Sequence, residues 1–218
     1  MFQILLDLLF PPKCMLCGHI MESSETAVCD RCLVSELPEL EGDPPPVRFF
    51  EKSAATFWYK EPISDAIIRF KFHGMVSYSR QFAQWLAGTI RARLDGRYDL
   101  ISWVPCSKRR IWSRGFDQAE LLAKDVAKEL GVEAVQTLKK VKHNPKQSRT
   151  VDAAARRANV LGVYRPCEPE RFRGKRILLI DDVLTTGATL SECGKVLRMA
   201  GSGDLCCAAI AAAHRNNE

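Results

Sequence analysis

The sequence predicts an α/β protein, in which helices flank a mostly parallel sheet and a small cysteine-containing segment comes first. Short apolar runs such as Ile177–Ile180 suit buried parallel strands. Stretches with apolar residues at helical spacing follow these runs, and strands that alternate with helices are typical of a parallel sheet. A chain of 218 residues has room for one such domain and a small appendage.

The charge of the chain is unevenly distributed. Residues 1–50 contain eight acidic and three basic side chains, for a net charge of −5. Residues 138–176 contain twelve basic and three acidic side chains, for a net charge of +9. The basic middle of the chain therefore indicates an anionic ligand, either a polyphosphate or a nucleic acid.

The first apolar stretch does not predict a signal peptide. Residues 2–10 have no basic residue before them, contain Asp7 and end at Pro11 and Pro12. We expect a short amphipathic helix there, packed against the rest of the protein. No apolar run approaches the length of a bilayer span, and the nine cysteines do not suit a disulfide framework. We therefore expect a cytoplasmic protein in a reducing compartment, without membrane insertion.

Two Cys-x-x-C pairs predict a structural zinc site. Cys14 and Cys17 form the first pair, and Cys29 and Cys32 follow after eleven intervening residues. This spacing suits a tetrahedral four-cysteine site, and a segment this short could hardly fold without a metal. Two redox-active pairs, or cysteines that share this spacing by chance, are the alternatives. Four thiolates leave no open coordination position, so we expect Zn²⁺ in a structural role.

The proline-rich stretch Glu41–Pro46 predicts the domain boundary. We expect an N-terminal helix and zinc ribbon over residues 1–43, a linker over residues 44–52 and the α/β domain over residues 53–218.

The first half of the α/β domain predicts two strands and two helices. The strands are expected over residues 53–60 and 99–104, and the helices run from Pro62 to near Gly74 and over residues 79–94. The first helix ends with three residues that we expect at a solvated or ligand-facing edge, namely Arg69, Lys71 and His73.

The stretch Pro105–Gly115 is predicted to be a cationic loop directly after a strand. It contains no acid, and its basic residues are Lys108, Arg109, Arg110 and Arg114. Loops beyond the carboxyl ends of parallel strands are where open α/β sheets bind ligands. A solvated surface loop is the alternative. A helix over residues 116–130, capped by Gly131, is expected to follow.

The remaining elements are less regular. Residues 132–138 are predicted to form a strand, and residues 139–157 form a long basic stretch without a clear period. A long polar loop inside a compact domain is usually a lid or disordered. The apolar pattern returns at residues 159–164, a strand is expected over residues 175–181, and residues 205–213 are expected to close the sheet.

The stretch Arg176–Leu197 has the features of a phosphate cradle. A strand ends at Asp181 and Asp182, a loop with three threonines and Gly187 follows, and a helix begins after it. The helix N-terminus offers unpaired N–H groups, and a glycine permits close backbone approach. The carboxylates suit ribose hydroxyls, or Mg²⁺ shared with a pyrophosphate. An ordinary strand-to-helix turn with two solvated aspartates is the alternative.

This stretch resembles the phosphoribosyl pyrophosphate (PRPP) signature of type I phosphoribosyltransferases. Over nearly its whole length, the chain resembles the ComF/GntX family, in which a zinc ribbon precedes a phosphoribosyltransferase-like domain. The motifs that carry the resemblance are F-P-P-x-C-x-x-C at Phe10–Cys17, C-x-x-C at Cys29–Cys32, V-P at Val104 and Pro105, K-R-R-x-x-x-R-G-F-D-Q-A-E-L-L-A at Lys108–Ala123, Gln147, Arg156, Asn159 and D-D-V-L-T-T-G-A-T at Asp181–Thr189. The chain departs from the family pattern at Asp117, where Asn is common, and in its single four-cysteine set, where many relatives carry a second cluster.

The resemblance implies a type I phosphoribosyltransferase fold and a PRPP site that works with Mg²⁺. Asp181 and Asp182 are the expected catalytic residues, which hold ribose hydroxyls directly or through Mg²⁺. The turn at Thr185–Thr189 is expected to hold the 5′-phosphate, and the basic stretch after Val104 the pyrophosphate. The expected PRPP-binding residues are Asp181, Asp182, Val183, Leu184, Thr185, Thr186, Gly187, Ala188, Thr189, Ser107, Lys108, Arg109 and Arg110.

Two classes of function remain open at this stage. The first is a PRPP-dependent phosphoribosyltransferase, for which no acceptor base can be named. The second is a non-catalytic module that senses PRPP or acts in DNA uptake during natural competence, a role that the resemblance implies for some members. Its partners would be a helicase-like or DNA-processing protein, or single-stranded DNA. Residues 138–176 contain only two aromatic residues, Tyr164 and Phe172, which weakens the expectation of a stacking groove for single strands.

Overall fold

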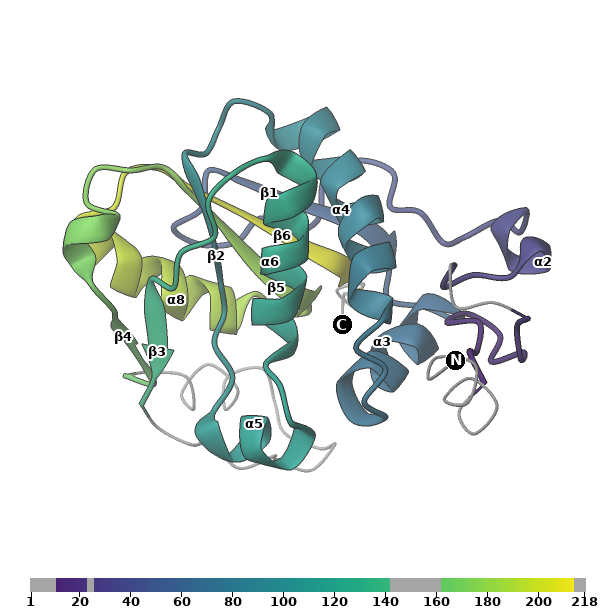
Figure 1. Cartoon of the computed structure of the whole chain (residues 1–218). Helices are drawn as coiled ribbons and strands as arrows, with labels where there is room; N and C mark the ends of the chain where they lie inside the picture. Colours follow the sequence, from purple (N-terminus) through teal and green to yellow (C-terminus); the bar gives the residue numbers. More distant parts are fainter. Residues whose placement is uncertain (1–10, 23–25, 142–161, 214–218) are drawn as a thin grey trace.

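The computed structural model of this chain describes residues 11–22, 26–141 and 162–213. The helix expected over residues 2–10 lies outside the described residues, as does the expected lid from residue 142 onward. The zinc ribbon and the α/β domain are both among the residues described (Figure 1).

A four-stranded parallel sheet forms the centre of the α/β domain. Its strands are β1 (Lys52–Trp58), β2 (Leu100–Trp103), β5 (Ile177–Leu184) and β6 (Leu205–Ala212), arranged in the order β1-β6-β5-β2. This confirms the predicted fold class. The last strand was expected to close the sheet, but it lies inside it, with all eight residues buried. Its alanines and two cysteines are small enough to fit between two covered faces.

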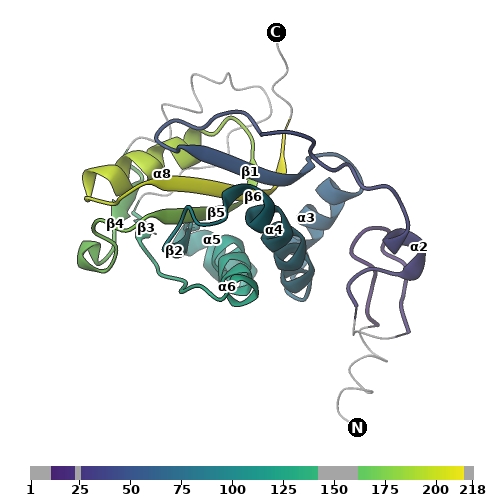
Figure 2. The same cartoon turned by 90° about the horizontal axis from the view of Figure 1, so that it is seen from above.

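Helices cover both faces of this sheet (Figure 2). Alternate residues of β5 belong to different cores because successive side chains of a strand point to opposite faces. Leu178 and Ile180 pack with α3 (Ile63–Phe72), α4 (Tyr78–Leu94) and α6 (Gln118–Leu130). Ile177 and Leu179 pack in the second core, which includes α8 (Ala188–Met199). The sheet is therefore the middle layer of three.

A two-stranded antiparallel ribbon lies beside the second core. It pairs β3 (Leu138–Lys140) with β4 (Tyr164–Pro166), and a short 3₁₀ helix, η1 (Pro169–Arg171), follows. The prediction of a strand over residues 132–138 was wrong. Within that range the structure shows an isolated bridge between Ala134 and Ile101, and β3 begins only at Leu138.

The N-terminal ribbon has little regular structure of its own. It contains an isolated bridge between Lys13 and Ile20 and the one-turn helix α2 (Asp30–Leu33), which has no buried residue. Met15, Leu16 and Val28 are buried in the same core as α3 and α4. The ribbon is thus packed against the α/β domain, and its hydrophobic residues extend that domain's core.

None of the helices in residues 11–22, 26–141 and 162–213, the part of the chain that the structure describes, combines the length and the apolar character needed for a bilayer crossing.

Candidate functional site

The acidic pair lies at the carboxyl end of β5. Asp181 and Asp182 are half-buried, and the backbone N–H of Asp182 donates to Oδ1 of Asp181 over 2.8 Å. Burial, together with the charge of Asp182, raises the pKa of Asp181 to about 8. The strand was expected to end at the pair but runs on to Leu184. A buried carboxyl beside a second carboxylate is a favourable place for a cation.

One cation already reaches this pair from a distant part of the chain. Nζ of Lys71, at the end of α3, lies 2.8 Å from Oδ1 of Asp182, and both side chains are largely buried. Burial is the largest single influence and opposes the charge of Lys71, but the charge and hydrogen bond of Asp182 and the charge of Asp181 together outweigh it and raise the pKa of Lys71. Lys71 was expected at a solvated or ligand-facing edge. The structure places it against the acidic pair, and no sequence spacing signals this contact.

The threonine-rich turn leads directly into α8. Thr185 is exposed, whereas Thr186 and Thr189 are half-buried. Gly187 has a left-handed φ of 72° immediately before the helix, and a side chain there would also approach Val47 at 3.4 Å. Leu184 packs in the second core, so only its backbone is available to a ligand. The first N–H groups of α8 therefore lie beside threonine hydroxyls, as an anion site requires, and that of Ala188 donates to Oγ1 of Thr186 over 3.4 Å.

The basic stretch is a helix and not the expected loop. The helix α5 (Lys108–Arg114) follows Ser107, whose backbone is extended, and ends at Gly115 with a left-handed φ of 84°. Lysine and arginine favour helices, and a serine before and a glycine after them are typical helix-terminating residues. These signals favour a helix over the predicted loop.

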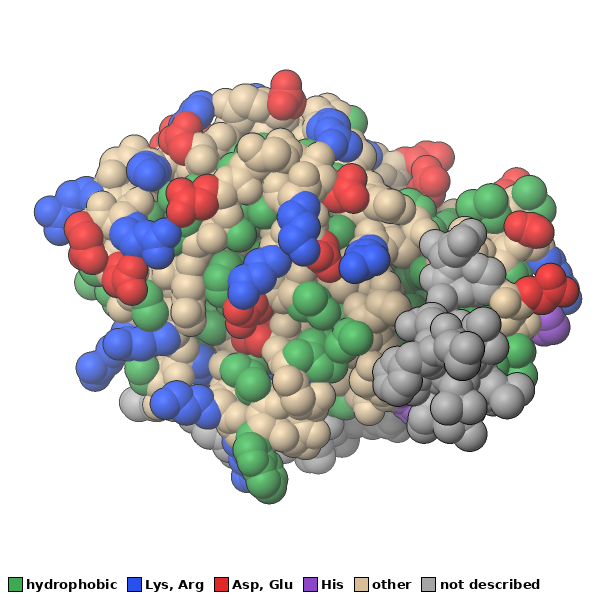
Figure 3. Space-filling model, viewed as in Figure 1, with side chains coloured by type: hydrophobic (Ala, Val, Ile, Leu, Met, Phe, Trp, Pro, Cys, Tyr) green, Lys and Arg blue, Asp and Glu red, His purple; other side chains and the backbone are tan. Residues whose placement is uncertain are grey.

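The helix α5 lies at the same edge of the sheet as the threonine-rich turn. Strand β2 pairs in parallel with β5, and its partner residues run from Leu100 with Ile177 to Trp103 with Ile180. The carboxyl ends of both strands therefore meet at one edge. Lys108 and Arg109 are exposed, Arg110 is half-buried and Ser107 is buried. In the lower part of Figure 3, most of the visible Lys and Arg side chains lie at the lower left, and a smaller basic area shows at the bottom near α5.

The structure also brings three residues to this edge that the predicted site did not include. They are Lys140 of β3, Tyr164 of β4 and Cys106. Nζ of Lys140 lies 3.4 Å from the hydroxyl oxygen of Tyr164. Burial, followed by the charge of Arg110, lowers the pKa of Lys140. Burial raises the pKa of Cys106 to about 12, with contributions from the charges of Asp117, Asp182 and Asp181. Lys140 belongs to the basic stretch seen in the sequence, but nothing in the sequence pairs it with Arg110.

Asp117 fixes the turn between β2 and α5. Its carboxylate accepts from the backbone N–H groups of Ala119 and Glu120 at the start of α6 and from that of Cys106 over 2.6 Å. Burial raises the pKa of Asp117, although these N–H groups act in the opposite direction. Ala119 and Glu120 donate to one carboxylate oxygen and Cys106 to the other. An asparagine has a single acceptor oxygen, so it could keep the bonds at the start of α6 but would place an NH₂ group opposite the N–H of Cys106.

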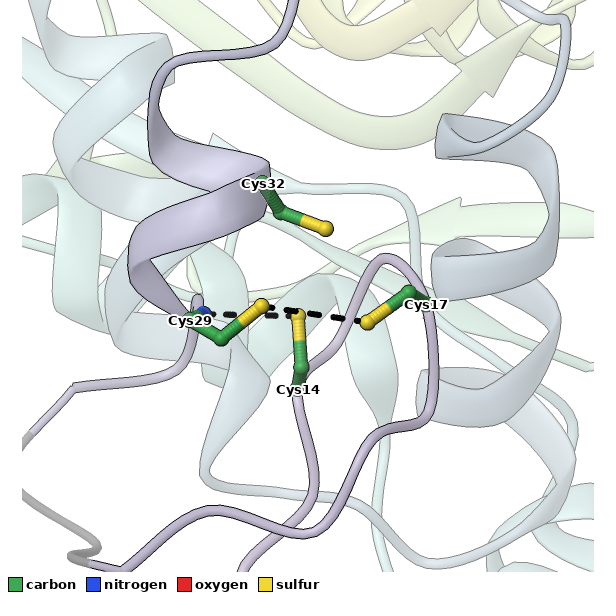
Figure 4. Close-up of side chains that lie close together, drawn as sticks. All are labelled: Cys14, Cys17, Cys29 and Cys32. Carbon is green, nitrogen blue, oxygen red and sulfur yellow. Dashed lines mark hydrogen bonds between the residues drawn. The ribbon is translucent and has the colours of Figure 1, made fainter.

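The four N-terminal cysteines form a metal centre. The sulfurs of Cys14, Cys17, Cys29 and Cys32 all lie within 4.8 Å of one another. Figure 4 shows the four side chains pointing toward a common centre from two separate turns of the chain. The sulfurs of Cys17 and Cys29 are 3.8 Å apart. A tetrahedral Zn²⁺ with Zn–S bonds of about 2.3 Å requires sulfur separations of roughly 3.8 Å, so the residues fit this ion.

The electrostatics of the cluster also suit a metal. Burial opposes ionisation of Cys14, but N–H donors, including those of Cys17 and Cys29, outweigh it and lower the pKa of Cys14 to about 7. Burial and the neighbouring thiols raise the pKa of Cys32 to about 12. A bound cation would favour the thiolate form of these cysteines. All four meet at one point, which favours the predicted zinc site over two separate redox pairs.

Comparison with known families agrees with both parts of the structure. Residues 117–218 match the family model described as the phosphoribosyl transferase domain, and residues 5–43 match the double zinc ribbon domain. The chain is similar to a glutamine PRPP amidotransferase of B. subtilis at 17% identity, with a TM-score of 0.44, over 65% of this chain and 30% of that one. The fold assignment does not depend on this weak likeness.

Curated relatives cover most of the chain. Competence protein F of Haemophilus influenzae is 32% identical over 196 residues, which cover 87% of this chain and 80% of that protein. Competence protein ComFC of Streptococcus pneumoniae is 31% identical over 153 residues, covering 69% and 64%. The DNA utilization protein YhgH of Salmonella typhimurium is 28% identical over 194 residues, covering 87% and 79%. The chain therefore belongs to the ComF family, in which a zinc ribbon precedes a phosphoribosyltransferase-like domain.

Proposed function

We propose that this chain binds PRPP together with Mg²⁺ at the edge of the sheet between α5 and the threonine-rich turn. The observation that carries the proposal is the position of the acidic pair, which lies directly before the turn that starts α8 and on the strand beside the one that leads to α5. One edge thus provides carboxylates, helix N–H groups and arginines. A ribose that carries a phosphate and a pyrophosphate needs these three kinds of group.

Each group has a role that follows from its chemistry. Asp181 and Asp182 hold the ribose hydroxyls, directly or through Mg²⁺, and Thr185–Thr189 enclose the 5′-phosphate with hydroxyls and backbone N–H groups. The residues proposed for the pyrophosphate are Lys108, Arg109 or Arg110, and Ser107 is proposed as a further PRPP-binding residue. When bound, Mg²⁺ supplies charge that stabilises the leaving pyrophosphate. Cations on the pyrophosphate and carboxylates near the ribose also favour the oxocarbenium-like state of a phosphoribosyl transfer.

The test is a thermal shift with PRPP in the presence and absence of Mg²⁺. A ligand that binds only the folded state raises the melting temperature. At a concentration one hundred times its dissociation constant, it adds about 2.7 kcal/mol to the free energy of unfolding. The double variant Asp181→Asn with Asp182→Asn should lose this shift while remaining folded. A matched control is Asp95→Asn with Asp204→Asn, since both residues are exposed and lie away from the acidic pair. An unchanged shift in the first variant would refute the site.

The names of the relatives support a second proposal, a role in DNA uptake, in which PRPP is sensed and not consumed. The exposed part of α5 favours it, because Lys108 and Arg109 accompany Trp112, whose side chain is 90% exposed. Cations beside an aromatic ring suit a single-stranded nucleic acid. By contrast, a cavity of about 530 Å³ beside α2 is lined by Glu36, Glu39 and Glu41 and does not suit DNA.

Two measurements separate these functions. Release of pyrophosphate from PRPP across a panel of nucleobase and amine acceptors identifies an enzyme. Binding of an oligothymidine strand that is weakened by Trp112→Ala, but not by Trp58→Ala in β1, identifies the nucleic-acid surface. A chain that binds PRPP but releases no pyrophosphate is a sensor.

A further inference from the structure

The last turn of α3 contacts two parts of the molecule that the sequence treats as separate. Nη1 of Arg69 donates to the backbone carbonyls of Met15 and Leu16, over 2.8 and 3.2 Å. These two carbonyls belong to the turn between Cys14 and Cys17 of the metal centre. Arg69 therefore holds the first Cys-x-x-C turn directly.

Two residues further along the same helix, Lys71 contacts the acidic pair. Its ammonium lies 2.8 Å from Asp182, and burial leaves 21% of the lysine side chain and 17% of the aspartate side chain exposed. Residues two apart in a helix project from roughly opposite sides. The helix α3 thus stands between the zinc ribbon and the candidate PRPP site, with one charged contact on each side.

The neighbouring aromatic residues fix this turn in place. Phe70 is fully buried, and its ring centroid lies 5.8 Å from those of Phe82 and Phe116. Phe72 lies beneath the guanidinium of Arg114, at the end of α5, at 4.4 Å. Four consecutive residues therefore tie α3 to the ribbon, the core, the acidic pair and α5. A packed helix held at this many points transmits a displacement instead of absorbing it.

We propose that α3 couples the zinc ribbon to the PRPP site: the ribbon, held by Arg69, fixes the last turn of α3 and so positions Lys71 against Asp182. This inference rests on the proposed function. Lys71 is a positioning residue, because it acts on the ligand through Asp182. It offsets one of two adjacent negative charges and holds that carboxylate in one orientation, which leaves the second oxygen for the ribose or for Mg²⁺.

Calorimetric titration with PRPP and Mg²⁺ tests the two ends of this connection. Lys71→Met should weaken PRPP binding about tenfold, because a charge-assisted contact of the pair is lost, and Lys71→Arg should recover most of the loss. Arg69→Met should weaken binding roughly threefold while the protein retains its zinc, a loss typical of coupling between sites.

The matched control is Tyr78→Phe. The hydroxyl of Tyr78 also donates to the ribbon, to the carbonyl of Lys13 over 3.2 Å, but it does so from α4 and not from α3. This variant should therefore bind PRPP like the wild type. It separates a general loosening of the ribbon from loss of the contact that runs through α3.

The route is tested with a variant that does not bind zinc, Cys29→Ser, which avoids a chelator that would also remove Mg²⁺. Cys29→Ser should weaken PRPP binding about as much as Arg69→Met, and the two changes together should cost no more than either alone. Additive losses, or wild-type affinity in either single variant, would overturn the coupling. Absence of PRPP binding by the wild type would instead overturn the proposed function.

Discussion

The N-terminal ribbon and the central sheet hold their chains in place by different means. The described part of the ribbon has one short helix without a buried residue, and its four cysteines meet at a single point. In the sheet, by contrast, the side chains of Ile177–Ile180 are fully buried and all of β6 is buried. The ribbon therefore depends on a metal, and the sheet on the removal of apolar surface from water.

At the edge of the sheet that carries the candidate site, neither of these two means of stabilisation applies. Its charged groups are crowded at the carboxyl ends of β2 and β5, and burial with like charge raises the pKa of Asp181 to about 8. Such groups cost stability and are retained where function needs them. The comparison thus separates the molecule into three regions, and each should respond differently to a single substitution.

Loss of the metal should have the largest effect on stability, and the unfolding should be confined to the ribbon. Cys29→Ser should abolish stoichiometric zinc and unfold the ribbon, because the apparent binding energy of such sites is about 10–16 kcal/mol. Metal analysis and limited proteolysis measure this outcome, with Cys167→Ser as the control because Cys167 lies outside the cluster. Cleavage throughout the sheet, and not only before residue 44, would show that the ribbon is essential to the whole fold.

A cavity in the core of the α/β domain should lower the stability of the sheet and leave zinc binding unchanged. Leu179→Ala, in β5, removes a fully buried side chain and should lower the free energy of unfolding by about 2–5 kcal/mol while zinc remains bound. Urea denaturation followed by circular dichroism gives this value, and Leu33→Ala, at a side chain that is 69% exposed, should change it little. Loss of zinc from Leu179→Ala would contradict the separation of ribbon and sheet.

A change on α5 should affect the ligand and neither stability nor zinc. If Arg110 binds the pyrophosphate, Arg110→Ala should weaken PRPP by roughly tenfold to a hundredfold, or about 1.5–3 kcal/mol. Ribose 5-phosphate, which lacks the pyrophosphate, should be affected far less. The control is Arg97→Ala, at an exposed arginine beside Asp204 and away from α5. Equal small losses of both ligands that vary with salt would mark Arg110 as a solvated surface charge.

A pH-dependent effect on stability is expected from neutralising Asp181 in the absence of a ligand. The raised pKa of Asp181 lets the folded state hold a proton that the unfolded chain has lost, so its contribution favours folding below about pH 4 and is lost as the pH rises to about 8. Asp181→Asn should therefore melt at a higher temperature than the wild type at pH 9, with a smaller difference at pH 5. Melting curves of Asp181→Asn and the wild type at pH 5 and pH 9 test this, with exposed Asp95→Asn as the control. An equal loss of stability in Asp181→Asn and the wild type between the two pH values would contradict the prediction.

The sequence by itself determined the local elements and the kinds of chemistry. The helical spacing of Leu190, Cys193 and Leu197 predicted α8, and the cysteine spacing predicted the metal cluster that the structure contains. The motif at Asp181–Thr189 predicted a strand, a turn and a helix in that order. These features are encoded over a few residues, where side-chain periodicity and turn chemistry are sufficient.

The tertiary structure alone decided which distant residues share the site. It placed β6 inside the sheet, brought Lys71 of α3 to Asp182, and set Lys140 beside Tyr164 near Arg110. A lysine at the end of a helix has the same local pattern whether it faces solvent or a carboxylate. Its partner is chosen when the helix packs against the sheet, because only packing determines which side of the helix is buried and what lies opposite to it.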